Sequence, residues 1–180
     1  MKEAQLFGET VEVASSADTN YNYIPKGFEI PADADYLHIT TNNTIYGTEM
    51  RHDLDSPVPL IADMSSDIMS RPIDVSKYNL IYAGAQKNIG PSGLCLLIVR
   101  KDLLGRAMDI CPKLLNWEVQ AKAGSMYNTP NTWGIYLAGL TFQWLKSIGG
   151  VKAVEKVNIE KAAMMYDFLD NSKLFTGAVR

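Results

Sequence analysis

The sequence predicts an α/β fold with a mainly parallel-stranded sheet flanked by helices. Its 180 residues, 47% hydrophobic and 21% charged, suffice for one globular domain or a substantial piece of a larger one. Several short runs are apolar at consecutive positions, which suits strands covered on both faces. After residue 100 the apolar spacing changes to that of helices.

Short apolar or β-branched runs give the predicted strands. They are TVEVAS (10–15), YLHIT (36–40), VPLIAD (58–63), NLIYAG (79–84) and LCLLIVR (94–100). Residues 1–8 resemble the last turns of a helix that ends at Gly8. Ligands usually bind at the carboxyl ends of parallel strands in such folds, so the residues after each run are candidates for a site.

Three helices are predicted beyond the last strand, around KDLLGRAMD (101–109) and over residues 132–147 and 151–168. The last has the clearest pattern, because apolar residues recur at helical spacing and lysines and glutamates fill the other face. Gly149 and Gly150 separate the last two helices. Two adjacent glycines there predict a hinge or domain boundary.

Charge and composition exclude several classes of protein. A net charge of -3 with scattered basic residues gives no footprint for nucleic acid. No apolar run is long enough to cross a bilayer, and the first residues lack a secretory signal, so the cytoplasm is the expected compartment. Cys95 and Cys111 are expected to be reduced, partly buried thiols, and no metal site is expected, since no CxxC spacing occurs.

Polar residues follow three of the predicted strands. Asn42, Asn43 and Thr44 come after YLHIT, Asp63 ends VPLIAD, and Gln86 and Lys87 follow NLIYAG. Because Lys87 lies between an apolar run and a glycine-rich turn, its amine is expected to face an interior or cleft, where a desolvated amine is a usable nucleophile.

An aspartate and a lysine at such strand ends are what a pyridoxal-phosphate enzyme needs. The amine forms a Schiff base with the cofactor aldehyde, and the carboxylate keeps the pyridine nitrogen protonated. Spacing alone equally suits an aspartate that caps a turn and a solvated lysine. The glycines do not form a phosphate loop, because GxxxxGK[ST] and GxGxxG are both absent.

LIADMSSDIMSRPIDVSKYNLIYAGAQKNIGPSG resembles the cofactor-lysine region of the phosphoserine aminotransferases, which are class V, fold-type I pyridoxal-phosphate enzymes. ASSADTNYNYIP, LHITTNNTIYGTE and SMYNTPNTWGIYLAGLTFQWLKSIGGVKAVEK resemble the same family in the same order. The resemblance implies that the chain is the central portion of such an enzyme. Residues 1–150 would be part of the cofactor-binding large domain, and residues 151–180 the linking helix and the start of a small carboxyl-terminal domain.

The resemblance also implies a role for each site residue. Lys87 would hold the cofactor and shuttle the proton, Asp63 would pair with the pyridine nitrogen, and Thr44 would orient the ring. Gln86 would contact the cofactor phosphate. Asn128 and Thr129 would reach the phosphate of the neighbouring subunit's cofactor, which implies a homodimer.

Other interpretations of these residues stay open. Thr44 could cap a turn, Asn128 is a good amino-terminal cap for the next helix, and His38 is expected to be a satisfied core histidine. Arg71 has no predicted role beyond an ion pair. Trp117, Trp133 and Trp144 are expected to be core or interface residues instead of a ring that stacks on the cofactor.

The resemblance implies ping-pong transamination, which interconverts phosphoserine and 2-oxoglutarate with 3-phosphohydroxypyruvate and glutamate in serine biosynthesis. The amino-terminal phosphate loop, the stacking tryptophan and the substrate-binding arginines of the family have no counterpart in this sequence. Two alternatives therefore stand beside this function: a catalytically incomplete α/β assembly or dimerisation module, and a related class V aminotransferase with another amino-acid substrate. A sheet that lacks strands is also expected to expose apolar surface and to associate.

Overall fold

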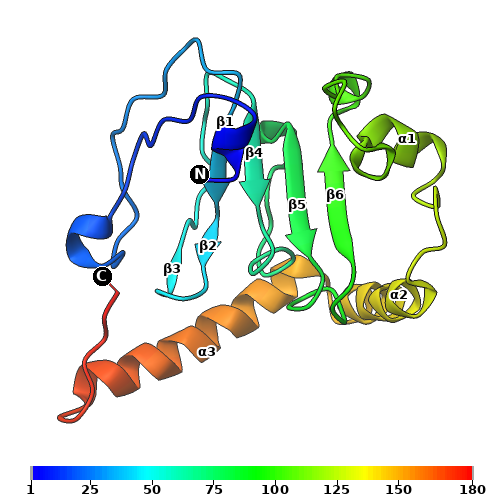
Figure 1. The fold of residues 1–180 in the computed structure, drawn as a ribbon. Coiled ribbons are helices and arrows are strands. Elements are labelled where there is room, and N and C mark those ends of the chain that lie inside the picture. The colour runs from blue at the N-terminus through cyan, green and yellow to red at the C-terminus, as the bar shows by residue number, and fades with distance from the viewer. Residues whose placement is uncertain (1, 180) are drawn as a thin grey trace.

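A computed structural model describes residues 2–179. Its central sheet has the strand order β1-β4-β5-β6, formed by Leu37–Thr40, Leu60–Asp63, Leu80–Gly84 and Cys95–Val99. β1, β4 and β5 are parallel, whereas β6 is antiparallel to β5 (Figure 1). The mainly parallel α/β sheet predicted from the sequence is therefore confirmed, with one antiparallel strand at its edge.

The small hairpin of β2 (Asn42–Asn43) and β3 (Thr48–Glu49) follows directly from β1. A backbone hydrogen bond from Thr41 N to Asp63 O (3.0 Å) connects the hairpin to the end of β4, and one from Met50 N to Thr41 O (2.7 Å) closes the base of the hairpin. The sequence did not predict this hairpin, because strands of two residues show no periodicity.

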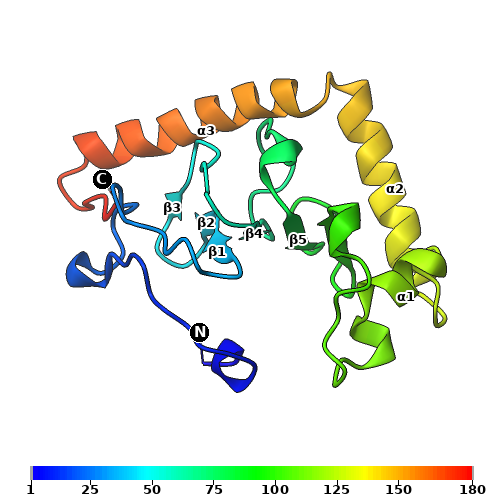
Figure 2. The ribbon, with the colours of Figure 1, turned by 90° about the horizontal axis from the view of Figure 1, so that it is seen from above.

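The helices are α1 (Trp117–Lys122), α2 (Thr132–Ser147) and α3 (Val151–Asn171). α2 has the predicted bounds, α3 ends three residues later than predicted, and α1 was not predicted. α3 crosses below the carboxyl ends of the parallel strands in Figure 1, and Figure 2 shows α2 turning away from it beyond β5.

Two adjacent glycines form the joint between α2 and α3. Gly149 has φ +102° and Gly150 has φ +73°, conformations that favour glycine. Gly150 N also donates to Leu145 O (2.9 Å), which ends α2. A Cβ atom at Gly149 would lie 3.1 Å from Ala153 Cβ, so the backbone turn and the close approach both require glycine there.

Three of the predicted helices and strands are absent from the described structure. TVEVAS (10–15) forms no strand, because no neighbouring strand pairs with it in the described structure and Val11 is exposed. Residues 101–109 contain only the 3-10 turn Lys101–Leu103. In the predicted helix over residues 1–8, the described part, residues 2–8, contains only the 3-10 turn Ala4–Leu6. Short apolar runs without long-range partners do not form regular elements.

The core lies between the sheet and the segments that connect its strands. Leu60, Ala62, Ile81 and Ala83 project from β4 and β5 into this core and are almost completely buried. The turn after β5 adds Ala85 and Ile89, and α2 adds Ala138. Strand packing thereby fixes the positions of the polar residues that follow β4 and β5.

Cys95 and Cys111 are free thiols, as expected. Cys111 is half-buried as predicted, whereas Cys95 is exposed, because β6 lies at the edge of the sheet. Within residues 2–179, no helix combines the length and hydrophobicity that spanning a bilayer requires.

Candidate functional site

The carboxyl ends of three neighbouring strands bring the polar residues of the candidate site together. In the parallel register Thr40 lies beside Asp63, and Asp63 lies beside Tyr82. The chain continues from β1 into the hairpin that carries Thr44, and from β5 into the turn that carries Lys87. Segments far apart in the sequence therefore meet at one edge of the sheet, as expected for a parallel α/β fold.

Lys87 contacts the hairpin directly. Its Nζ donates a hydrogen bond of 2.8 Å to Thr44 Oγ1, across 43 positions of sequence. The turn that holds Lys87 is closed by a hydrogen bond from Gly90 N to Ala85 O (2.8 Å), and Gly90 packs on the backbone of Ala138 in α2. The predicted grouping of Thr44 and Lys87 is thus present as a direct contact.

The Lys87 side chain is exposed in this chain, so the expectation of a desolvated amine is wrong. The apolar run ends at Ala85, and the next three residues, 86–88, are exposed before Ile89 returns to the core. Lys87 nevertheless borders a hollow of about 270 Å³ between its turn and the helices α2 and α3. Trp144 of α2 and Lys161 of α3 line the same hollow.

Asp63 is half-buried at the end of β4, and its Oδ1 accepts a hydrogen bond from Ser65 N (2.9 Å). The turn-capping alternative for this aspartate is therefore realised. Ser65 Oγ in turn accepts from Gly84 N (3.0 Å), which ties the end of β4 to the end of β5. These contacts fix the direction of the Asp63 carboxylate relative to the Lys87 turn.

His38 and Tyr82 share a sheet face with Asp63, and His38 Nε2 lies 2.9 Å from Tyr82 Oη. Loss of hydration lowers the pKa of His38, and the charge of Asp63 opposes this shift. Burial and the nearby Asp63 carboxylate raise the pKa of Tyr82 to about 12. His38 is exposed, so its assignment to the core is wrong, although its ring does have a partner.

Sequence reasoning missed Tyr82 as a neighbour of Asp63. Side chains alternate between the two faces of a sheet, and the parallel register pairs Asp63 with Tyr82. This alternation was the available signal, and the consecutive apolar residues of the run 79–84 obscured it.

Gln86, Asn128 and Thr129 are exposed. In the described part of the chain, no hydrogen bond joins them to Lys87, Thr44 or Asp63. The cap of α2 is Asn131, whose Oδ1 accepts from Gly134 N (3.0 Å), so the capping alternative for Asn128 is wrong. The helix begins at Thr132, and only a residue directly before it can reach the free amide groups of its first turn.

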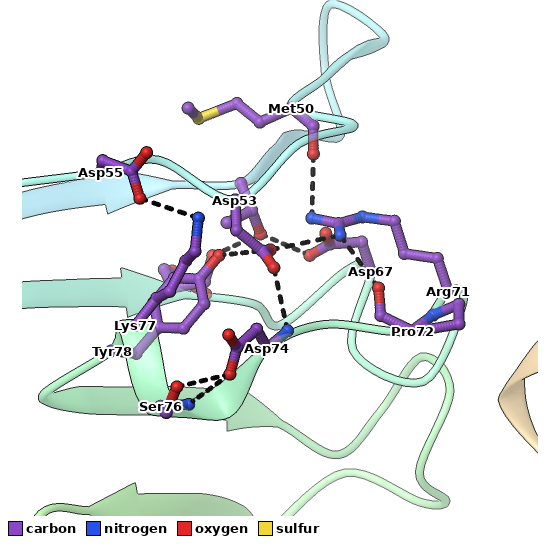
Figure 3. A network of polar contacts seen from close by, with 12 residues as sticks. Met50, Asp53, Asp55, Asp67, Arg71, Pro72, Asp74, Ser76, Lys77 and Tyr78 are labelled. Carbon is purple, nitrogen blue, oxygen red and sulfur yellow. Dashed lines mark hydrogen bonds and ion pairs between the residues drawn. The ribbon is translucent and has the colours of Figure 1, made fainter.

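Arg71 forms the predicted ion pair. Its Nη1 lies 3.4 Å from Asp53 Oδ1, in a network that also includes Tyr78 and Asp74 (Figure 3). This network lies on the segments that enter and leave β4, next to the hairpin. The sequence did not predict its extent, because its members are scattered over residues 53–78.

The fold and the site together define a class of protein. A lysine after one parallel strand and a carboxylate after its neighbour, within an α/β fold, are typical of pyridoxal-phosphate enzymes. The aminotransferase class-V family matches residues 5–179, and the chain belongs to this family.

Similar proteins agree with this assignment. The phosphoserine aminotransferase of Bacteroides fragilis is 58% identical over 177 residues, which cover 98% of this chain and 50% of that protein. The pyridoxal-phosphate-bound phosphoserine aminotransferase of Trichomonas vaginalis superposes with a TM-score of 0.92 at 38% identity, over 99% of this chain and 51% of that one.

The phosphoserine aminotransferase of Bacillus circulans subsp. alkalophilus gives a TM-score of 0.91 at 43% identity, over 94% of this chain and 48% of that one. The resemblance to phosphoserine aminotransferases and the predicted fold class are confirmed. The chain spans about half the length of the curated relatives it matches.

Proposed function

We propose that the chain is the central portion of a phosphoserine aminotransferase. The whole protein would exchange the amino group between O-phospho-L-serine and 2-oxoglutarate by a ping-pong reaction in L-serine biosynthesis. The observation that carries the proposal is the 2.8 Å contact between Lys87 Nζ and Thr44 Oγ1, at the sheet edge where Asp63 ends the neighbouring strand. The relatives at 57–59% identity support the choice of substrates.

The side chains at this edge fit pyridoxal phosphate. Lys87 offers a primary amine that solvent reaches, Thr44 offers a hydroxyl beside it, and Asp63 offers a carboxylate oriented by Ser65 N. When bound, the cofactor supplies an aldehyde and an aromatic ring that accepts electrons. Among the described side chains, no ion pair involves the Asp63 carboxylate.

Each residue then has a distinct task. Lys87 would hold the cofactor through its amine, and the same amine would move the proton at the substrate Cα. Asp63 holds a proton on the pyridine nitrogen, because an anionic carboxylate favours the protonated ring. Thr44 would orient the ring and holds the Lys87 amine by the hydrogen bond between them, and Gln86 would hold the cofactor phosphate.

The proposal extends to the assembly. Asn128 and Thr129 lie exposed on the loop before α2, where a second subunit has access to them. They would bind the phosphate of the cofactor in a homodimer in the cytoplasm. Residues 1–150 would be part of the large domain, and residues 151–180 the linking helix and the beginning of the small domain.

Labelling with the cofactor tests the site. The chain is incubated with pyridoxal phosphate, reduced with borohydride, digested and analysed by mass spectrometry. We expect one phosphopyridoxyl adduct, on Lys87, that disappears in Lys87→Ala and persists in the control Lys161→Ala, which changes the other lysine of the hollow. Adducts spread over many lysines, or none on Lys87, would contradict a formed site in this chain.

Turnover provides the second test. In an active full-length assembly, Lys87→Ala should abolish transamination while the circular dichroism spectrum stays unchanged. Steady-state activity in that variant would refute the assignment of Lys87. Comparison of phosphoserine with unphosphorylated serine in the same assembly tests the choice of substrate against a related aminotransferase.

Exposed apolar surface favours a second candidate, a catalytically incomplete assembly module. α2 and α3 expose large apolar side chains, as expected for a chain prone to association; they include Trp133, Tyr136, Trp144, Ile159, Met164 and Phe168. Sedimentation at increasing concentration should reveal association of this chain. Association without any Lys87 adduct would favour the module over the enzyme.

A further inference from the structure

The hairpin that presents Thr44 is held at both of its ends by the segment between β4 and β5. Thr41 stands at the entry of the hairpin and Met50 at its exit, and Met50 N donates to Thr41 O (2.7 Å). Thr44 itself is exposed near the tip. The position of Thr44 therefore depends on how these two ends are anchored.

The entry is anchored by a buried carboxylate. Thr41 Oγ1 lies 2.6 Å from Asp67 Oδ1 and 3.1 Å from Asp63 O. Thr41 is 1% exposed and Asp67 5% exposed, so the contact is shielded from water. Burial raises the pKa of Asp67, and the Thr41 hydroxyl and the charge of Arg71 oppose this shift. A buried carboxylate of this kind is retained only with such partners.

The exit is anchored by a guanidinium group. Arg71 Nη2 donates to Met50 O (3.0 Å), and Nη1 donates to Pro72 O (3.2 Å) and pairs with Asp53 (Figure 3). The Arg71 side chain is 10% exposed. The planar guanidinium can hold several acceptors in fixed directions, which a lysine ammonium cannot do.

The same segment also braces the Lys87 turn. Asn88 Nδ2 donates to Ile68 O (2.9 Å), and Gly84 N donates to Ser65 Oγ (3.0 Å). Residues 63–71 thus contact both the hairpin that carries Thr44 and the turn that carries Lys87. The separation of these two side chains follows from where this stretch places the hairpin and the turn.

We propose that Asp67 and Arg71 are positioning residues that hold Thr44 against Lys87 Nζ. They clamp the two ends of the hairpin, so the hydroxyl is in place before any ligand binds. This inference deepens the proposed function, and it rests on that function for its catalytic meaning. The clamp itself is a property of this chain and is measurable without cofactor.

Amide hydrogen exchange, followed by mass spectrometry, measures the clamp in the 180-residue chain. Asp67→Ala should raise exchange in residues 41–50 by about tenfold, the effect of losing a hydrogen bond to a charged group, while β5 keeps its protection. Asp67→Asn retains an acceptor oxygen and should restore most of the protection. Lys77→Met, which breaks only the exposed pair with Asp55, is the matched control and should change nothing in the hairpin.

Competitive acetylation of lysines measures the consequence at the site. In Asp67→Ala the acetylation of Lys87 relative to Lys161 should rise by about twofold or more, because the amine loses its hydroxyl partner. If Asp67→Ala fails to fold, Arg71→Lys decides, since it retains the charge but cannot reproduce the contacts of Arg71 with Met50 and Asp53.

Faster amide exchange confined to residues 41–50, together with higher acetylation of Lys87, would support the clamp. This result would hold even if cofactor labelling of Lys87 failed, which would contradict only the proposed function. Unchanged exchange in residues 41–50 would overturn it. Uniform loosening of the whole chain in both Asp67→Asn and Arg71→Lys would also overturn it, because the two residues would then act only on global stability.

Discussion

Removing one hydroxyl group from the polar network around Asp53 tests how that network stabilises the fold. Tyr78 is 5% exposed, and its hydroxyl donates to Asp53 Oδ1 (2.9 Å). Tyr78→Phe keeps the ring in the core and deletes only this donor. Asp53 would still accept from Asp74 N (2.9 Å) and pair with Arg71 (3.4 Å).

The expected loss follows from these contacts. A hydrogen bond to a charged group contributes about 1.5 to 3 kcal/mol, and the remaining partners of Asp53 place this one near the lower end, at about 1.5 to 2 kcal/mol. For a chain of this length, each kcal/mol lowers Tm by about 2 to 4 °C, so Tm should fall by roughly 3 to 8 °C.

The loss should also depend on pH. Burial alone would raise the pKa of Asp53, but the hydrogen bonds from Asp74 N and Tyr78 and the charge of Arg71 outweigh it, so the pKa lies below its ordinary value. The stabilisation by Asp53 is therefore present above its unfolded pKa of about 3.9 and is lost as pH falls through the folded value. The penalty of Tyr78→Phe should shrink over the same range.

Urea unfolding at pH 7 and at a series of acidic pH values measures both effects. Tyr36→Phe is the control, because Tyr36 is exposed and its hydroxyl has no hydrogen bond within residues 2–179. A Tyr78→Phe penalty below about 0.5 kcal/mol at pH 7, the range of neutral surface changes, would refute the reasoning. A full penalty that persists unchanged below the pKa of Asp53 would refute its electrostatic part.

Two further changes probe the sheet. Asn79→Ala should lower the unfolding free energy by about 1 to 3 kcal/mol, because the buried Asn79 Oδ1 accepts from Leu60 N (2.9 Å) and the variant leaves that amide unpaired; an unchanged urea midpoint would contradict this. His38 should titrate below about pH 6.5 by NMR, since loss of hydration lowers its pKa. The folded state favours the neutral ring, so the contribution of His38 to the unfolding free energy is present above its unfolded pKa and is lost as pH falls through its folded pKa. A midpoint at or above the ordinary histidine value would show that Asp63 outweighs desolvation.

Local patterns were sufficient to predict the strands β1, β4 and β5 and the bounds of α2. The runs that form β4 and β5 are apolar at consecutive positions, and most of these residues are buried in the structure. The apolar spacing of α2 predicted its bounds but not its burial, because only Gly134 and Ala138 of this helix are buried. The direction of β6 was not predicted, although a signal was present. Only ten residues separate Gly84 from Cys95, which suits an antiparallel connection, whereas a parallel one needs a longer crossover.

The candidate site could be predicted only in part. The grouping of Thr44 and Lys87 was recovered because both follow strands of one parallel sheet. The exposure of Lys87 was not predicted, since it depends on which segments pack over its turn. The roles of Asp67 and Arg71 arise from contacts across about twenty positions or more, and no local pattern marks such contacts.

The two glycines between α2 and α3 set the direction in which the long last helix leaves the fold. α3 has 21 residues, and in the described structure its side chains reach the β4–β5 segment by one hydrogen bond, from Asn158 Nδ2 to Ser70 O (3.1 Å). At 1.5 Å per residue the helix is about 31 Å long, so a rotation of about 10° at Gly149 and Gly150 would swing its far end by roughly 5 Å. Asn158 lies less than halfway along α3, so its hydrogen bond to Ser70 would oppose such a rotation close to the joint. A change at these three residues would therefore be felt most strongly at the distal end of the helix, beyond Lys161, far from where the chain was altered.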